Sequence, residues 1–260
     1  MRAALLLNFV KQDLVDRYSG SFMGRAWAFL MPLLQILIFI FVFSAVMGAK
    51  LASLGGDLGE SVFAYSIYLI SGILAWNAFS NTIARVACIY SDKAALIGKV
   101  QIDLAALPLY ILITEAVVYL VGMLFFAAFL FLIDMFHPQY WIWLPLIFLV
   151  QQLFAYAFGF ICAVFNVLFK DVREFVTVGL QLWFWLTPVV YVVGILPERF
   201  HFFFILNPVV HLMDAYRNIV LYQQPPELVP LAVVALIAVV LLFLGVKIFR
   251  RLERDIRDFI

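Results

Sequence analysis

The sequence has few charged residues and few cysteines, and each shortage excludes a class of protein. Charged residues make up 13% of the 260 residues, well below the roughly 25% of soluble globular domains, so a soluble fold would lack polar surface. Cys88 and Cys162 are isolated, which indicates neither a disulfide framework nor a zinc site. The net charge of +1, without a basic patch, gives no support for binding nucleic acid. These absences favour a membrane protein.

The chain also lacks the motifs of an enzyme or an ATPase. No segment matches G-x-x-x-x-G-K-[ST], because Gly98-Lys99 has no upstream glycine and no following Ser or Thr. No Ser-His-Asp set or metal-ligand cluster is evident, and His137, His201 and His211 stand alone. We therefore expect no catalytic residues, no metal site and no cofactor bound by this chain. Any active transport would draw its energy from another subunit.

Long apolar runs dominate what is present. Hydrophobic residues make up 67% of the chain and aromatics 17%, and several runs exceed the roughly 20 helical residues that cross a bilayer. We predict an all-α, polytopic membrane protein with six transmembrane helices. The predicted spans are 27–49, 62–86, 104–133, 141–169, 175–195 and 228–246. Only Lys50, Arg199 and Arg217 of the 17 Lys and Arg would then lie outside, so the positive-inside rule places both termini in the cytoplasm.

The first residues form an amphipathic pattern at 5–19. Leu7, Val10 and Leu14 recur at helical spacing, with Lys11 and Arg17 among the charged residues of the other side. A helix lying along the cytoplasmic membrane surface is the interpretation we favour. The alternative is that this segment merely extends the first span.

Prolines break the apolar stretch between the fifth and sixth spans. Pro197 and Pro208 stand where first helical positions would be, and Asn207 is a suitable cap before Pro208. Asp214 and Arg217 are spaced to pair on the second helix. Broken helices at membrane depth survive where protein or a water-filled cavity shelters them. We predict two short re-entrant helices, which act as a gate or as a static plug.

Glu115 is the only carboxylate deep in a long apolar span. An acid there is a candidate proton relay or ion site. Alternatively it is interhelical polar glue; the candidate partners are Gln35, Gln151, Gln152 and Gln181. The lack of a second intramembrane acid favours the structural interpretation.

Two further groups have a functional and a plain interpretation. Aromatic side chains in the outer half could stack on sugar faces, or could simply pack between helices; they are Phe39, Phe43, Trp183, Phe184, Trp185 and Tyr191. Arg17 and Arg25 flank a glycine-rich break at the inner membrane edge. They could bind an anionic lipid headgroup or a pyrophosphate, since Arg binds phosphate bidentately, or could be ordinary positive-inside charges.

With these residues in place, the chain resembles the membrane subunits of ATP-binding-cassette exporters for surface polysaccharides, the type-2 (type V) permeases of the O-antigen or lipopolysaccharide kind. The resemblance spans nearly the whole chain. It is carried by DLVDRYSGSFMGRAWAFLMPLL at 13–34, FKDVREFV at 169–176, LTPVVY at 186–191, Leu196-Pro197, Asn207-Pro208 and Arg217-Asn218.

The resemblance implies one transmembrane domain over 1–260. Its parts are an interface helix and entrance loop (1–24), spans one to five (25–195), gate helices (196–225), span six (226–249) and a cytoplasmic tail (250–260). A short coupling helix around 92–100, which Ser91 or Asp92 could cap, would fit a cleft of the ATPase.

The resemblance also implies four sites. The entrance for the lipid diphosphate would comprise Arg17, Gly24 and Arg25. The ATPase-coupling surface would comprise Ser91, Asp92, Lys93, Ile97, Lys99, Val100, Lys170 and Asp171. The glycan channel would comprise Phe39, Phe43, Trp183, Phe184, Trp185 and Tyr191. The gate would comprise Pro197, Asn207, Pro208, Asp214 and Arg217.

The implied function is export of an undecaprenyl-diphosphate-linked O-antigen polysaccharide across the bacterial inner membrane. The implied partners are a second copy of the chain and two ATPase subunits, which would bind the ATP and Mg. Export of capsule or teichoic-acid polymer is the alternative within the family. A secondary transporter would need paired intramembrane charges and an inverted repeat, and the sequence displays neither feature. A membrane enzyme would need a paired acidic or histidine site, which the sequence does not display either.

Overall fold

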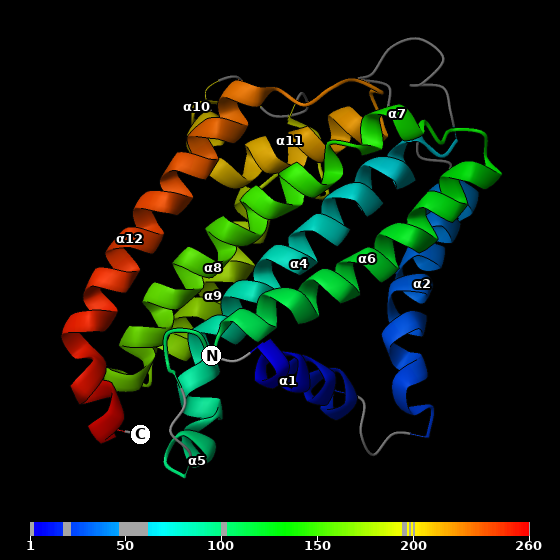
Figure 1. Cartoon of the computed structure of the whole chain (residues 1–260). Coiled ribbons are helices and arrows are strands. Elements are labelled where there is room, and N and C mark those ends of the chain that lie inside the picture. The colour runs from blue at the N-terminus through cyan, green and yellow to red at the C-terminus, as the bar shows by residue number, and fades with distance from the viewer. Residues whose placement is uncertain are drawn as a thin grey trace.

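The computed structural model describes residues 3–17, 22–46, 62–99, 103–193, 197, 199 and 201–259. Every regular element in these ranges is a helix. Figure 1 shows long helices running side by side, with both termini at the same end of the molecule. The prediction of an all-α, polytopic membrane protein is confirmed.

Among the described residues, five helical stretches are long and apolar enough to cross a membrane. They are α2 (Trp27–Ile40) continued by the π-helix η2 (Phe41–Val46), α4 (Ala64–Asp92), α6 (Leu109–Leu132), α7 (Pro138–Trp141) with α8 (Leu144–Leu168), and α12 (Leu228–Phe259). The predicted fifth span is the exception, so the count of six is not confirmed. Its helix α9 (Val172–Leu186) has 15 residues, about 22 Å of helix against a bilayer core of about 30 Å.

Prolines explain where the observed helices depart from the predicted spans. The predicted span 175–195 stops being helical at Leu186, because Thr187 is extended (φ −109°, ψ 131°), as a residue that precedes a proline prefers to be; residues 194 and 195 lie outside the described ranges. The predicted helix 104–133 is present as a candidate span, but its predicted start is wrong. Helix α6 begins only after Pro108, whose missing N–H suits the start of a helix. At the other end of the chain, α12 continues to Phe259, so the charged tail extends the last helix.

Helix α4 lies at the centre of the molecule. It packs against α8 and α6 along most of its length, and α8 in turn packs against α12. Gly159 lets α4 and α8 approach closely, because a Cβ there would lie 3.1 Å from the Ile83 carbonyl oxygen and 3.2 Å from the Ile83 Cα. Helices α4 and α8 are therefore largely buried, whereas α2, α6 and α12 expose most of their apolar surface.

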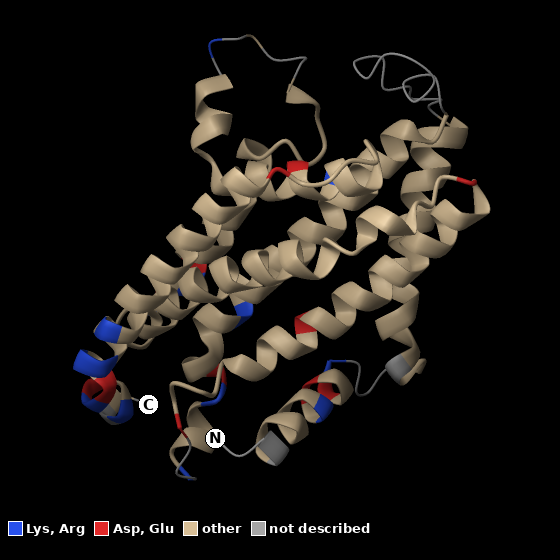
Figure 2. Ribbon diagram, turned by 45° about the horizontal axis from the view of Figure 1, so that its top comes forward, with Lys and Arg blue, Asp and Glu red and all other residues tan. Residues whose placement is uncertain are grey.

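Helix α1 (Ala3–Asp16) lies across the end of the bundle that carries both termini (Figure 1). Val10 is buried there in a second hydrophobic cluster, which also contains Tyr110, Phe249 and Ile256. The prediction of an amphipathic helix holds, but its apolar face is shifted, because Leu7 is 60% exposed. Lys, Arg, Asp and Glu residues gather at this end of the molecule (Figure 2).

The segment after α4 is shorter than predicted. A helix of two or three turns around 92–100 was expected, but α5 (Ala94–Ile97) is a single turn. Ser91 and Asp92 do not cap it, because α4 continues through both of them and Lys93 takes the N-cap position without a side-chain bond. Val100 lies outside the described residues.

The two short helices predicted after the fifth span are present. They are α10 (His201–Leu206) and α11 (Pro208–Val220), and both lie at the end of the molecule opposite the termini (Figure 1). Asn207 caps α11 as predicted, because its side chain accepts a hydrogen bond from the Val209 N–H at 3.1 Å. Pro197 itself is not helical, and the described part of α10 begins at His201.

Candidate functional site

An aromatic cavity lies between the end of α9 and the two short helices. Its volume is about 800 Å³. Its lining residues are Trp183, Trp185, Leu186, Tyr191, Phe203, Phe204, Leu206, Asn207 and Pro208. Three of the predicted channel aromatics thus meet two of the predicted gate residues at one cavity. Phe203 and Phe204 were not foreseen, because only the end of α9 at Thr187 brings α10 beside it.

Asn207 holds this cavity together. Its side-chain amide donates to the Thr187 hydroxyl at 3.0 Å and to the Leu186 carbonyl at 3.3 Å. Its carbonyl oxygen accepts from the indole N–H of Trp183 at 3.0 Å, in addition to capping α11. One side chain therefore fixes the broken end of α9 against the start of α11.

The channel aromatics do not behave alike. Trp183 is anchored, because its ring also packs edge-on against Phe79 and Phe154 of the core. Trp185 touches the Phe184 ring edge-on, with centroids 5.3 Å apart, but is 64% exposed, and stacking on a sugar needs an accessible ring. The hydroxyl of Tyr191 donates to the Trp185 carbonyl at 2.7 Å, which fixes the loop that follows α9.

A smaller, more polar groove of about 290 Å³ runs along α9 beside α4. Its lining residues are Trp76, Ser80, Asn81, Ala84, Thr177, Leu180, Gln181, Phe184 and Trp185. Phe184 faces this groove and packs edge-on against Trp76, with ring centroids 5.5 Å apart. Because Trp185 lines both hollows, the groove and the aromatic cavity adjoin along one side of α9.

Phe39 and Phe43 lie elsewhere. Their rings stack with centroids 6.2 Å apart, and Phe43 packs edge-on against Tyr65 of α4 at 5.3 Å. The structure therefore uses them to attach the first span to α4. It does not bring them to the aromatic cavity, whose lining comes from α9, α10, α11 and the connecting loops.

Arg217 of α11 is almost fully buried, with 2% of its surface exposed. Its guanidinium donates to the carbonyls of Pro188 at 2.6 Å and Val189 at 3.2 Å, which the end of α9 leaves free of helical bonds. It also lies over the ring of Tyr68, 3.6 Å from the ring centroid. Gly72 makes room for it, because a Cβ there would lie 3.2 Å from Nη2 of Arg217.

The predicted pair of Asp214 and Arg217 is present at 3.6 Å. The carboxylate side chain is 56% exposed, whereas the arginine is buried. Burial lowers the pKa of the Arg217 guanidinium, and Tyr68 and Asp214 oppose that shift. The main partners of Arg217 are therefore backbone carbonyls and an aromatic ring, and the ion pair is secondary.

Glu115 is not alone in the membrane, contrary to the sequence-based view, nor are glutamines its partners. Its Oε1 accepts from Arg17 and from Arg85, each at 2.5 Å. Arg85 also binds Asp13 at 2.5 Å. Ion pairs thus attach Asp13 of α1 to α4, and Arg17, which directly follows α1, to α6. This network could not be seen in the sequence, because its bonded partners are up to 98 residues apart.

The entrance residues are only partly described. Arg17 is engaged with Glu115 rather than free. Gly24 has a positive φ of 51°, a conformation that side chains with a Cβ resist, and it begins the 3-10 turn η1 (Gly24–Ala26) that leads into α2. Arg25 belongs to that turn, but its side chain lies outside the description.

The predicted coupling residues come together at the end of the molecule that carries the termini. Asn166 at the end of α8 donates to the Ser91 hydroxyl at 3.3 Å, and Arg173 at the start of α9 binds Asp92 at 3.4 Å. The turn between α8 and α9, which holds Lys170 and Asp171, is therefore tied to the α4–α5 corner. Lys170, Asp171 and Lys99 are exposed, and Lys93 is half-buried. Ile97 is 8% exposed and packs in the second hydrophobic cluster, so it is not a surface residue as predicted.

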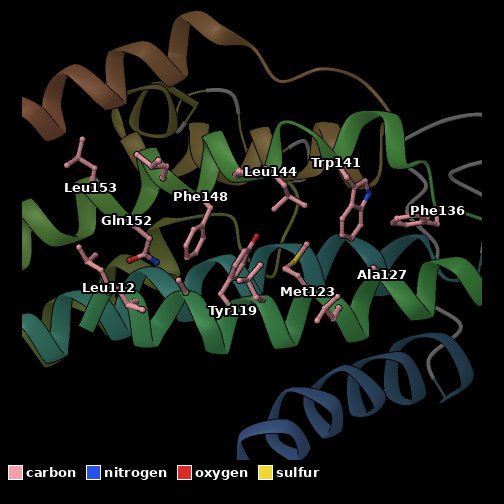
Figure 3. Close-up of a pocket in the computed structure, with 16 residues that line it drawn as sticks. Leu112, Tyr119, Met123, Ala127, Phe136, Trp141, Leu144, Phe148, Gln152 and Leu153 are labelled. Carbon is pink, nitrogen blue, oxygen red and sulfur yellow. The ribbon is translucent and has the colours of Figure 1, made fainter. Parts of the chain in front are cut away.

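An apolar cleft of about 800 Å³ separates α6 and α8 (Figure 3). Tyr119 and Phe148 stack across it with ring centroids 4.4 Å apart. The rest of the wall is mainly apolar and includes Leu112 and Leu120 of α6 and Leu149 of α8. Sugars need polar partners, so this cleft does not suit a glycan.

Comparison with known proteins agrees with this geometry. Residues 5–221 match the family described as ABC-2 type transporter. The chain is 29% identical to the O-antigen export system permease protein RfbA of Myxococcus xanthus, over 98% of this chain and 94% of that protein. It is 26% identical to the protein of that name in Klebsiella pneumoniae, over 96% and 92%. It is 22% identical to the polysialic acid transport protein KpsM of Escherichia coli, over 93% and 91%.

Proposed function

Because the chain belongs to the ABC-2 type transporter family, we propose that it is the membrane subunit of an exporter for O-antigen polysaccharide. The polymer would cross the bacterial inner membrane attached to undecaprenyl diphosphate. The names of the Myxococcus and Klebsiella relatives support this substrate. Export of a capsule polymer is the second candidate, which the KpsM relative supports; teichoic acid is a further alternative within the family.

The observation that carries the proposal is the junction of the polar groove with the aromatic cavity at Trp185. A sugar has hydroxyls at its edges and C–H groups on its faces. The groove offers Asn81, Thr177 and Gln181 to the hydroxyls, while the cavity offers flat rings to the faces. Such a surface binds each sugar weakly, which suits a polymer that must keep moving.

The two short helices would act as the gate at the outer end of this path. Asn207 and Arg217 hold α11 against the broken end of α9, so a movement of α9 must either carry the gate along or break these bonds. Pro197, Pro208 and Asp214 would complete the gate. With both termini in the cytoplasm, this end of the molecule faces away from the cytoplasm.

Energy would come from a separate ATPase subunit that binds ATP and Mg. The docking surface would comprise the exposed α4–α5 corner and the α8–α9 turn, where Asp92 and Arg173 join the two segments. A push on this surface reaches α4 and α9 directly, because both helices begin or end there. Two ATPase subunits would serve two copies of the chain.

A second copy of the chain would complete the channel. Helix α9 exposes large apolar side chains, including Phe175, Leu182 and Trp185. Phe29 of α2 and Phe41 of its continuation η2 are exposed as well. The groove and the aromatic cavity both lie on the α9 side. A partner packed against α2 and α9 would therefore close these hollows into a pore with a lateral opening toward the lipid.

Loss of the chain from its host tests the substrate. A deletion strain should keep lipid-linked O-antigen on the cytoplasmic face of the inner membrane, where antibody cannot reach it in intact spheroplasts, and a plasmid copy should restore surface display. Normal surface O-antigen in the deletion strain, with a capsule polymer retained instead, would select the second candidate.

A further inference from the structure

The charge network at α1 points to a site whose role no comparison assigns. We propose that Glu115 is an internal stand-in for phosphate. It holds Arg17 in the resting protein and yields Arg17 to the diphosphate of the lipid carrier when that group enters. This inference rests on the proposed function and specifies how its entrance is regulated.

The network contains two acids and two arginines with unequal bonding. Arg17 binds Glu115, whereas Arg85 binds both Glu115 and Asp13 through its two terminal nitrogens. If Arg17 leaves, Glu115 keeps Arg85 as its partner, so no buried carboxylate is left unpaired, which would be costly. Arg17 is therefore the member of the network that can be exchanged.

Arg17 and Glu115 also line a cavity of about 190 Å³ between the end of α1 and helices α2, α4 and α6. Three neutral amides share this lining: Gln35, Asn77 and Asn81. The Asn77 amide donates to Gln35 at 3.3 Å, a weak bond that a stronger acceptor could replace. The cavity thus provides one guanidinium and several neutral donors, the groups that bind a phosphoryl oxygen.

The resting network is under-satisfied. Glu115 is 1% exposed, and its Oε2 has no hydrogen-bond partner among the described residues. The Arg17 side chain is 24% exposed, so it can be approached from outside. A guanidinium has five donors arranged for bidentate binding of phosphate, but here Nη2 serves one carboxylate oxygen. A diphosphate would use this cation more fully than Glu115 does.

Binding of a short isoprenyl diphosphate to the purified full-length subunit in detergent tests the exchange. The probe is geranylgeranyl diphosphate, measured by isothermal titration. Glu115→Gln frees Arg17 and should bind the probe about tenfold more tightly than the native protein. Arg17→Gln should bind at least tenfold more weakly, and Arg17→Lys should fall between the native protein and Arg17→Gln. Glu115→Asp, which shortens the acid by one methylene, should tighten binding less than Glu115→Gln does.

Matched controls separate the site from general charge effects. Lys11→Gln removes a positive charge from the exposed face of α1, and Glu174→Gln removes an exposed acid from α9; both should bind like the native protein. Geranylgeraniol, which lacks phosphate, should not discriminate among the variants. Inorganic pyrophosphate and phosphatidylglycerol, used as competitors, report whether a free anion or a phospholipid headgroup takes the site instead.

Failure of the Arg17 exchange and failure of the proposed export function would give different results. If Glu115→Gln and Glu115→Asp bind no more tightly than the native protein, or if Arg17→Gln binds equally well, the exchange is overturned while export is untouched. If phosphatidylglycerol displaces the probe at equal concentration, the site is a lipid site and the inference fails. If the variants shift affinity as expected but the deletion strain still displays its polymer, only the proposed function fails.

Discussion

At the scale of single residues, the buried Arg217 joins three parts of the structure. It belongs to α11, it donates to the carbonyls of Pro188 and Val189 after the end of α9, and it lies over the ring of Tyr68 on α4. The sequence indicated only its pairing with Asp214. It could not indicate burial, because the carbonyls of Pro188 and Val189 meet Arg217 only when α11 packs against the end of α9.

Arg217→Gln should destabilise the subunit by about 2 to 3 kcal/mol, since it removes charged hydrogen bonds from buried acceptors. Asp214→Asn is the matched control and should cost well under 1 kcal/mol, because its side chain is largely exposed. Thermal unfolding of the detergent-purified variants measures both. An equal loss of stability in the two variants would mean that the ion pair is the main interaction of Arg217.

Gly72→Ala should weaken the same junction without altering any charge. The new Cβ would lie 3.2 Å from Nη2 of Arg217 and 3.3 Å from the Val189 carbonyl oxygen, and relieving such crowding costs about 1 to 3 kcal/mol. Gly179→Ala on α9 is the control, because its Cβ would meet nothing within 4 Å. If the midpoint of thermal unfolding falls for Gly179→Ala and not for Gly72→Ala, Gly72 does not make room for Arg217.

Two tryptophans on the same helix should respond differently to replacement by alanine. Trp185→Ala should leave the unfolding temperature nearly unchanged and slow polymer export several-fold, since its exposed ring lines both hollows. Trp183→Ala should instead lower stability by about 2 kcal/mol, less than loss of a fully buried aromatic, because this partly buried ring packs on Phe79 and binds Asn207. Unchanged export by Trp185→Ala, with normal protein levels, would make that ring mere packing.

At the scale of helices, the sequence predicted existence and type better than ends. Hydrophobic length indicated the long helices, and Asn207-Pro208 indicated the start of α11, since a cap and a first-turn proline act locally. Pro108 and Pro188 determine where α6 begins and where α9 ends. Hydrophobicity alone could not predict these ends, because some prolines, such as Pro32 in α2, lie inside a helix without ending it. The Glu115 network was beyond prediction, because Arg17 and Arg85 meet Glu115 only after α1 has packed across the bundle.

The short helix α5 and the α8–α9 turn should act as one coupling surface. Asp92→Ala removes an ion pair between exposed side chains, so the loss of stability should stay below about 1 kcal/mol. Export should nevertheless fall several-fold while the partner ATPase continues to hydrolyse ATP, because the two segments no longer move together. Lys247→Ala, which removes an exposed charge from the second half of α12, serves as a control. Full export by Asp92→Ala in vesicles would remove this pair from the coupling path.

At the scale of the whole molecule, the chain is a membrane bundle whose described charged residues gather mostly at one end, the charged end that carries the termini (Figure 2). The charged end has the features of a soluble partner's docking site, and the opposite end has those of a gate. The sequence has no G-x-x-x-x-G-K-[ST] loop, and we propose that a separate subunit uses the ATP. Its exposed α2 and α9 faces support assembly with a second copy.

Reconstitution of the subunit with its partner ATPase into proteoliposomes tests ATP-driven export. We expect lipid-linked polysaccharide to reach the protected compartment only when both subunits and hydrolysable ATP are present, and we expect none to move under an ion gradient alone. Polymer transfer by this chain alone, driven by an ion gradient without nucleotide, would rule out ATP-driven export.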